Sequence, residues 1–327
     1  MRAVVRSYRD FARREARGRS AAYEALAESV ADDRALVGFI ASLPPAKRQP
    51  QLVFAAARFL LDGLDGPLGI GALRDLAAGS PAELTRVILA RGTQTNEAAR
   101  CAVLLPALAD LPQPLALIEV GASAGLTLLY DRYSYDYGGH RLAGSDPLAP
   151  TLRCRTSGPV PLPARIPEIA WRIGLDLSPL DVTREDDRRW LSFLVWPGEG
   201  DRAERLRSAI ATARRDPPTV RRGDLLTDLP ALAAEAPAGA TVVVCHSSVL
   251  YQVEPYDRER FAAVVRSLGC RWVSSEAPGI VPGTAMPATD DQMCVLARDG
   301  RPLAYADSHA TRLHWLREPD DARERPR

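Results

Sequence analysis

The segment Gly121-Ala122-Ser123-Ala124-Gly125 has residue types and a spacing that could serve either of two chemistries. It fits G-x-S-x-G, the turn that presents a nucleophilic serine in α/β-hydrolases. Together with Glu119 it also nearly fits E-x-G-x-G-x-G, the strand-to-helix loop that receives S-adenosylmethionine in class I methyltransferases. Ser123 is therefore either a nucleophile or a small residue that lets the backbone approach a cofactor.

The hydrolase interpretation requires an acid and a histidine that follow Ser123 in the chain. Asp290 or Asp291 and then His309 could supply them in the order Ser, acid, His. However, a hydrolase turn lies in the middle of its sheet, so strands and an oxyanion-binding segment such as HGGG should precede it. The 110 residues upstream show almost no strand alternation and contain no HGGG, which favours the methyltransferase interpretation.

In that interpretation, Gly121 and Gly125 let the backbone approach the methionine part of the cofactor, and a helix starting near Gly125 directs free N–H groups to its carboxylate. Asp176, in "GLDLSP", ends a strand where a carboxylate could accept hydrogen bonds from ribose hydroxyls. Asp136 is a competing ribose ligand, and Asp176 could instead be a turn residue. The candidate cofactor-binding residues are Glu119, Gly121, Ala122, Ser123, Gly125, Asp176, Asp224 and Leu225, the last two next to adenine.

His246 ends an apolar strand and is the candidate general base, because an unperturbed imidazole titrates near neutral pH. A structural histidine is the alternative. The candidate substrate-binding residues are Asn96, Glu97, Arg100, Tyr135, Ser247 and Glu276. For the segment from Asn96 to Arg100 the alternative is a helix cap followed by a solvated face, and for Glu276 it is an ordinary loop.

The elements that must position these residues change in type along the chain. Residues 1–112 show helical spacing, with Tyr23, Leu26, Ala27 and Val30 on one face and a capping box of Ser80 and Glu83. From residue 113 to 316, strands and helices alternate, and a hairpin around Asp299-Gly300 follows them. The predicted strands lie within 115–120, 168–177, 218–226, 240–250 and 270–277, and the clearer helices within 205–215 and 258–269.

This pattern predicts an α/β fold of the class I methyltransferase-like, Rossmann-like type. A helical N-terminal subdomain is expected to precede a mostly parallel sheet that ends in an antiparallel hairpin. Glu119 and Asp176 lie 57 positions apart, whereas nucleotide folds place the acid about 20 residues on. An insertion over about 132–167, rich in Tyr, Gly and Pro, is therefore expected as a lid or substrate loop, and the charged tail 317–327 is predicted to be disordered.

Composition restricts the partners. The 42 Lys and Arg residues nearly balance the 41 Asp and Glu residues, so nucleic acid is not the expected partner of the whole chain. No apolar run is long enough to span a membrane, and the charged N-terminal segment lacks the features of a signal peptide, so we expect a cytoplasmic protein. The five cysteines are odd in number and form no C-x-x-C, so neither a metal site nor a disulfide framework is expected.

A set of segments resembles an uncharacterised bacterial family, domain of unknown function 2332, over about residues 8–316. The segments are "RQPQLVFAAARFLL", "TQTNEAARCAVLLPAL", "IEVGASAGLTLLYDRYSYDYGG", "GLDLSPLDV", "WLSFLVWPGEGDRAERLRSAI", "RRGDLLTDLPAL" and "HSSVLYQV". The resemblance implies a methyltransferase-like Rossmann fold with a helical N-terminal region, and it supplies no substrate.

We therefore expect an S-adenosylmethionine-dependent methyltransferase that acts on a small molecule by aligning acceptor and sulfonium, with His246 assisting deprotonation. Three alternatives remain: a serine esterase that uses Ser123 and His309, a nicotinamide oxidoreductase, and a non-catalytic binding module. The loop lacks the middle glycine of G-x-G-x-x-G, which disfavours the oxidoreductase. The sequence indicates neither the methyl acceptor nor an oligomeric state.

Overall fold

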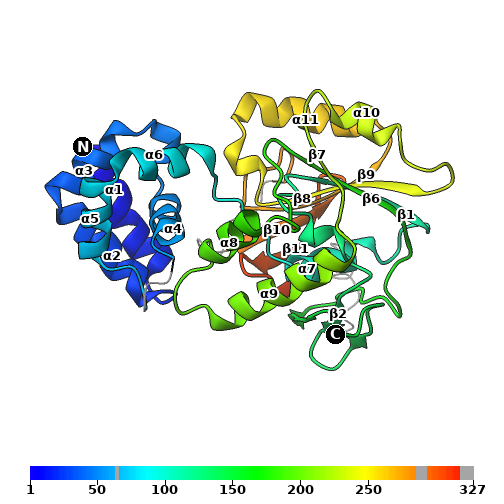
Figure 1. Cartoon of the computed structure of the whole chain (residues 1–327). Coiled ribbons are helices and arrows are strands. Elements are labelled where there is room, and N and C mark those ends of the chain that lie inside the picture. The colour runs from blue at the N-terminus through cyan, green and yellow to red at the C-terminus, as the bar shows by residue number, and fades with distance from the viewer. Residues whose placement is uncertain (63–65, 285–292, 317–327) are drawn as a thin grey trace, which may run out of the picture. The chain divides into compact units, whose positions relative to one another are not determined.

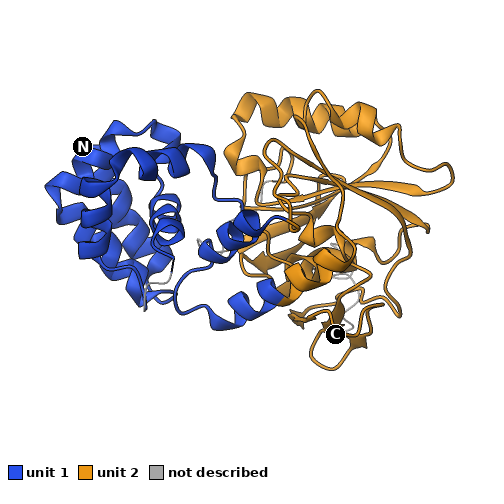
Figure 2. Cartoon of the chain, viewed as in Figure 1, with its two compact units in different colours: residues 1–95, 184–207 blue, residues 96–183, 208–327 orange. Residues whose placement is uncertain are grey.

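The computed structural model describes residues 1–62, 66–284 and 293–316. The predicted disordered tail 317–327 lies outside these ranges, as do Asp290 and Asp291. The chain forms two compact units (Figure 2): unit 1 comprises residues 1–95 and 184–207, and unit 2 comprises residues 96–183 and 208–327. The sequence predicts a boundary at residue 112 instead. The difference arises because α7 (Arg100–Leu104) packs against strands of unit 2, whereas α8 (Glu185–Phe193) packs against helix α4 of unit 1.

Unit 1 is helical, as the sequence predicts. Its elements are α1 (Arg2–Phe11), the π-helix η1 (Ala12–Ala16), α2 (Ala21–Asp32), α3 (Arg34–Ser42), the 3-10 helix η2 (Pro45–Lys47), α4 (Pro50–Leu60), α5 (Ile70–Gly79), α6 (Pro81–Ala90), α8 and the first half of α9 (Gly200–Arg215). The predicted apolar face of α2 is buried throughout. In the core of unit 1, Phe54 of α4 packs against the rings of Tyr8, Phe11 and Tyr23.

Helix caps in unit 1 differ from the sequence prediction. Ser80 makes no capping hydrogen bond at the start of α6, so the capping box predicted for Ser80 and Glu83 is wrong. The caps that form are Ser20 on α2, which accepts from the N–H of Tyr23, and Asp33 on α3, which accepts from the N–H groups of residues 35 and 36. These oxygens satisfy backbone donors that have no partner within the helix.

Unit 2 is built on a nine-stranded sheet whose order is β5-β12-β11-β10-β9-β8-β1-β6-β7. Figure 1 labels the strands of this sheet except β5 and β12. The strands are β1 (Leu115–Val120), β5 (Arg155–Ser157), β6 (Ile169–Asp176), β7 (Val220–Arg222), β8 (Thr241–Ser247), β9 (Arg271–Glu276), β10 (Met293–Arg298), β11 (Arg301–Asp307) and β12 (Arg312–Trp315). The other elements of this unit are α7, the 3-10 helices η3 (Leu105–Leu108), η4 (Leu126–Leu128) and η5 (Leu250–Gln252), and the helices α10 (Leu229–Ala233) and α11 (Pro255–Ser267).

The strands β7, β6, β1, β8 and β9 are parallel neighbours, and β10, β11 and β12 follow in antiparallel order. Every residue of β1 is buried, as expected for a central parallel strand covered on both faces. The predicted α/β class is therefore confirmed: a helical N-terminal region precedes a mostly parallel sheet that ends in antiparallel strands.

A hydrophobic layer covers one face of this sheet. Phe261, Ala262 and Val265 of α11 pack with Ile118 of β1 and Val244 of β8 in one buried cluster. Burial at three- and four-residue spacing on α11 explains why its helical pattern is readable from the sequence. In the described part of the chain, no helix has the length and apolar character needed to cross a bilayer.

The insertion predicted at 132–167 forms a second, small sheet. Its order is β3-β2-β4, with β2 (Ser134–Asp136), β3 (Arg141–Leu142) and β4 (Thr151–Arg153). The segment then returns to the main sheet, where β5 pairs with the C-terminal strand β12 at the edge. The insertion is thus an ordered part of unit 2.

Candidate functional site

The carboxyl ends of five parallel strands meet at one edge of the main sheet. From β1, the chain adds β6 and then β7 on one side of the sheet. It then crosses to the other side of β1 and adds β8 and β9, so the winding reverses between β1 and β8. Ligands of open α/β sheets bind outside the carboxyl ends of the strands at this reversal point. The loops after β1, β6, β7 and β8 are therefore the candidate site.

The loop after β1 has an unusual backbone and a tightly packed environment. Gly121, Ser123 and Gly125 have φ of 70°, 53° and 71°. A Cβ atom on Gly121 would lie 2.4 Å from Cγ2 of Val249, and one on Gly125 would lie 2.8 Å from Cγ of Pro218. Both glycines are thus required by the protein's own packing, in addition to their positive φ.

The helix predicted to start near Gly125 is absent. Residues Leu126–Leu128 form a single 3-10 turn, and the loop from Ala122 to Tyr130 is buried. Free N–H groups at this position are predicted to face a cofactor carboxylate, but the N–H of Leu126 donates to Oδ1 of Asn96 at 2.7 Å. The predicted helix N-terminus is therefore wrong, because a side chain of this unit satisfies the backbone donor.

Ser123 is only 3% exposed, and its N–H donates to Asp176 Oδ2 at 2.8 Å. The predicted acids of a hydrolase triad, Asp290 and Asp291, lie outside the described residues. Ala122, next to Ser123, is fully buried. In the described structure, Ser123 is therefore a buried residue of a closely packed loop.

Asp176 ends β6 and connects two neighbouring loops. Its Oδ2 accepts from Ser123, and its Oδ1 accepts from the N–H of Ser178 at 2.8 Å. By accepting hydrogen bonds from these two N–H groups, the Asp176 carboxylate fixes the loop after β1 and the loop after β6 at the carboxyl end of the sheet. The next residue, Leu177, is 65% exposed although it is large and apolar.

Sequence reasoning missed Leu177 as a candidate. The signal in the sequence is the position of an apolar residue between an acid and Ser-Pro in "DLSP", directly after the predicted ribose ligand.

Asp136, the competing ribose ligand, lies elsewhere. It belongs to β2 of the small sheet, and its Oδ1 accepts from the N–H groups of Gly138 and Gly139. Those backbone hydrogen bonds lower its pKa. Asp136 is therefore a turn-stabilising residue outside the main sheet, which favours Asp176 of the two.

Asp224 and Leu225 follow β7, as the sequence predicts. Asp224 Oδ1 accepts from the N–H groups of Leu226 and Thr227, which makes a side-chain-closed turn. Leu225 is half-buried and packs against the hydrophobic cluster.

Glu119 is a fully enclosed carboxyl group in the middle of the sheet. Its Oε1 accepts from the Thr127 hydroxyl, and Oε2 has no hydrogen-bond partner in the described structure. Burial raises its pKa from 4.5 to about 8, although the Thr127 hydrogen bond and the Arg100 charge act in the opposite direction. Burial therefore favours the protonated form of Glu119.

The segment from Asn96 to Arg100 lies at the same edge as the loop after β1. Asn96 and Glu97 are 7% and 6% exposed, so the alternative of a solvated helix face is wrong. Glu97 Oε1 accepts from the N–H of Ala99. Arg100 is half-buried and donates to the carbonyl and the hydroxyl of Ser247, at the end of β8, over 3.0 and 3.2 Å.

His246 is buried in a chain of hydrogen bonds that occupies both ring nitrogens. Trp272 Nε1 donates to Nε2 at 3.0 Å, and Nδ1 lies 2.8 Å from Glu276 Oε1. Because Nε2 accepts, Nδ1 carries the proton and donates it. At 1% exposure His246 has no nitrogen available to a substrate, so its geometry corrects the prediction of a general base and supports the structural alternative.

Glu276 organises the turn after β8. Besides His246, its Oε1 accepts from the N–H groups of Val249 and Leu250, while its Oε2 is buried with no hydrogen-bond partner among the described residues. Ser248, at the start of this turn, has a positive φ of 53°. Glu276 is thus a buried anchor, and the alternative of an ordinary loop residue is wrong.

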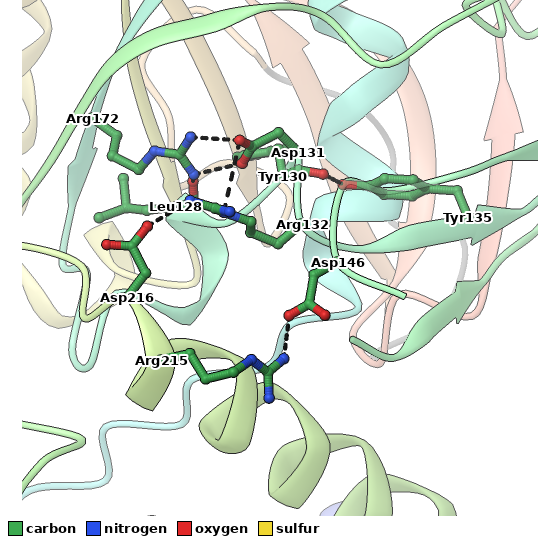
Figure 3. Close-up of polar contacts among 9 residues, drawn as sticks. All are labelled: Leu128, Tyr130, Asp131, Arg132, Tyr135, Asp146, Arg172, Arg215 and Asp216. Carbon is green, nitrogen blue, oxygen red and sulfur yellow. Dashed lines mark hydrogen bonds and ion pairs between the residues drawn. The ribbon is translucent and has the colours of Figure 1, made fainter. Parts of the chain in front are cut away.

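Tyr135 belongs to β2 of the small sheet and not to a loop at the carboxyl edge of the main sheet. It is 1% exposed, its hydroxyl donates to the Tyr130 carbonyl at 2.7 Å (Figure 3), and its ring stacks on Tyr137. The geometry therefore corrects its prediction as a substrate-binding residue.

A polar network at the start of the insertion contains residues that sequence reasoning missed (Figure 3). Arg172 of β6 makes a two-pronged ion pair with Asp131, at 2.6 and 2.8 Å. The sequence feature that could have identified Arg172 is its charge inside a largely apolar strand, because a charged side chain at such a position requires a partner. The adjoining hollow of about 310 Å³ is lined by Leu129, Arg132, Ser145, Asp146, Pro147, Thr212, Arg215 and Asp216.

Opposite charges in this hollow are already paired. Arg132 lies 2.5 Å from Asp216, and Arg215 pairs with Asp146. The pKa of Asp146 is lowered, chiefly by its hydrogen bond from Arg215. The network therefore fastens the insertion to the end of α9. Among the described residues, no group of three or more His, Cys, Asp or Glu side chains could hold a metal ion.

Comparisons with known proteins place the chain in a family. A crystal structure of a possible exported protein from Bordetella parapertussis is 13% identical, and the match covers 84% of this chain and 69% of that one with a TM-score of 0.28. A TM-score this low does not establish a shared fold. No curated protein matches the sequence significantly. The family model "Uncharacterized protein conserved in bacteria (DUF2332)" matches residues 5–315, and the chain therefore belongs to this family.

Proposed function

We propose that unit 2 binds S-adenosylmethionine at the carboxyl ends of β6, β1 and β7 and transfers its methyl group to a small-molecule acceptor. The observation that carries this proposal is the pair formed by Asp176 and the exposed Leu177 beside the reversal point of the sheet. A carboxylate next to a free apolar surface suits a nucleoside, because ribose offers hydroxyl donors and adenine offers a flat apolar face.

The residues fit the adenosine half of this cofactor better than its methionine half. Asp176 at the end of β6, Leu177 directly after it, and the closed turn at Asp224 after β7 lie at neighbouring strand ends. By contrast, the space in front of Gly121 is filled by the side chain of Val249. Binding of the methionine half at this loop therefore requires Val249 to move away.

S-adenosylmethionine supplies an electrophilic methyl group when bound. The contribution that this chain can make is to hold the acceptor in line with that group, which can provide a large part of a rate enhancement. Arg100, held by Ser247 at the end of β8, is the half-buried charged side chain available to orient an acceptor. His246 is not assigned a role in proton transfer, because both of its nitrogens are engaged.

Calorimetric titration with S-adenosylmethionine and S-adenosylhomocysteine tests the proposal. The informative variant is Leu177→Asp, and the matched control is Leu148→Asp, since Leu148 is an equally apolar residue of unit 2 that is 73% exposed. Neither substitution removes buried contacts, so both variants should remain folded. We expect wild type to bind with a Kd of about 10 μM, which corresponds to about 7 kcal/mol.

Leu177→Asp should weaken binding about tenfold or more, because it places a charge against the adenine face, and Leu148→Asp should leave it unchanged. The absence of heat from folded wild type, or equal weakening by both substitutions, would contradict the proposal. Transfer of a labelled methyl group to metabolites of low molecular weight is then the test of activity.

A further inference from the structure

A row of arginines occupies one face of α1 and continues into the π-helix η1. Arg2, Arg6, Arg9 and Arg13 are spaced four, three and four residues apart, which places them on one stripe of the helical surface. The helix rises about 1.5 Å per residue, so the row extends over about 16 Å. The opposite face of α1 is occupied by the buried side chains of Val4, Tyr8 and Phe11.

This row lines a hollow between α1 and its neighbours α2 and α3. The hollow has a volume of about 480 Å³, and Arg34, at the start of α3, adds a fifth guanidinium. Its apolar surface includes Val5 and Val37, and Asp32 is its single acidic residue. Figure 1 shows α1, α2 and α3 together in this part of unit 1.

The charges in this hollow are poorly compensated. Arg9 pairs with Asp32 at 2.8 Å, and Arg13 of η1 pairs with Asp10 of α1 at 3.1 Å. In the part of the chain that the structure describes, the exposed side chains of Arg2, Arg6 and Arg34 have no ion-pair or hydrogen-bond partner.

Other arginines of unit 1 have their positive charge neutralised by a carboxylate. Arg17 pairs with Glu24, Arg74 with Asp33, and Arg19 with Glu199. Asp32 and Asp10 pair with two of the five guanidinium groups, so three positive charges are left without an ion-pair partner among the described residues, and an anionic ligand would relieve their repulsion. Guanidinium forks also match phosphate oxygens in geometry.

We propose that this hollow in unit 1 binds a small anion that carries a chain of two or three phosphate groups. Its volume is that of a small-molecule site. Among the residues that the structure describes, its lining contains no aromatic side chain on which a nucleic-acid base could stack, which favours a phosphate chain over a single-stranded nucleic acid. The site lies wholly in unit 1, and it stands independently of what unit 2 binds.

The test is calorimetric titration of the full chain with inorganic tripolyphosphate at low ionic strength. The variants are Arg6→Gln and Arg34→Gln, and the control is Arg86→Gln, whose side chain is 69% exposed on α6 of the same unit and outside the hollow. All three positions are exposed, so the variants should fold, and circular dichroism checks this. A short oligothymidylate is titrated in parallel.

We expect tripolyphosphate to bind wild type, with an affinity that falls as salt is added. Arg6→Gln and Arg34→Gln should each weaken binding about tenfold, because each removes a charge-assisted contact, and Arg86→Gln should not change it. The assignment is overturned if tripolyphosphate does not bind, if the control weakens binding equally, or if oligothymidylate binds more tightly than tripolyphosphate.

Discussion

We expect Glu119 to lower the stability of the fold as the pH rises, and we expect its replacement by glutamine to remove this effect. Burial raises the pKa of this carboxyl group from 4.5 to about 8 in the folded protein. Below pH 4.5 the group is protonated in both states and costs nothing. Between pH 4.5 and about 8, only the unfolded chain releases the proton, so unfolding becomes progressively more favourable.

The loss of stability can be calculated from the pKa shift of Glu119. Each pKa unit corresponds to about 1.4 kcal/mol, so a shift from 4.5 to about 8 lowers the free energy of unfolding by about 5 kcal/mol once the pH passes 8. Glu119→Gln keeps the shape of the protonated acid and an oxygen that can still accept from the Thr127 hydroxyl. The variant should therefore match wild type at pH about 4 and exceed its stability increasingly as the pH rises.

Urea unfolding of both proteins over this pH range measures the difference. Taking the difference between the two proteins cancels the contributions of all other titrating groups. Glu259→Gln, at an exposed position on α11, is the control and should follow wild type. A stability difference between Glu119→Gln and wild type that does not grow with pH would refute the reasoning.

Two further predictions concern packing and buried hydrogen bonds. Gly121→Ala should destabilise by about 2–4 kcal/mol, because φ is 70° and the new Cβ would lie 2.4 Å from Val249, whereas Gly138→Ala, with φ of 81° but nothing within 4 Å, should cost about 1–2 kcal/mol. Equal losses in thermal or urea unfolding would show that the Val249 contact is unimportant. Trp272→Phe removes the donor to His246 Nε2 and should cost about 1–3 kcal/mol, and an unchanged unfolding midpoint would disprove that hydrogen bond.

The regular elements could be predicted because their residues carry the information locally. The buried run of β1 and the turn at Asp299-Gly300 between β10 and β11 each follow from a few adjacent residues. The apolar spacing of α2 and α11 identifies helices in the same way. The edge at which the candidate residues gather then follows from parallel strand order.

The site chemistry could not be predicted to the same extent, because it depends on partners that are distant in sequence. The loop after Gly125 is closed by Asn96, which lies 30 residues earlier. His246 is occupied by Trp272 and Glu276, 26 and 30 residues later. Local patterns place a polar residue near a strand end, but they do not reveal which groups already satisfy it.

Locating the bound cofactor directly tests the central claim. S-adenosylmethionine carrying a labelled methyl group is cross-linked to wild type by ultraviolet light, and the labelled tryptic peptide is identified. We expect label on the peptide 173–184, which contains Asp176 and Leu177, and loss of that label when excess S-adenosylhomocysteine is added. Label that is confined to unit 1, or label that S-adenosylhomocysteine does not displace, would contradict binding at the carboxyl end of β6.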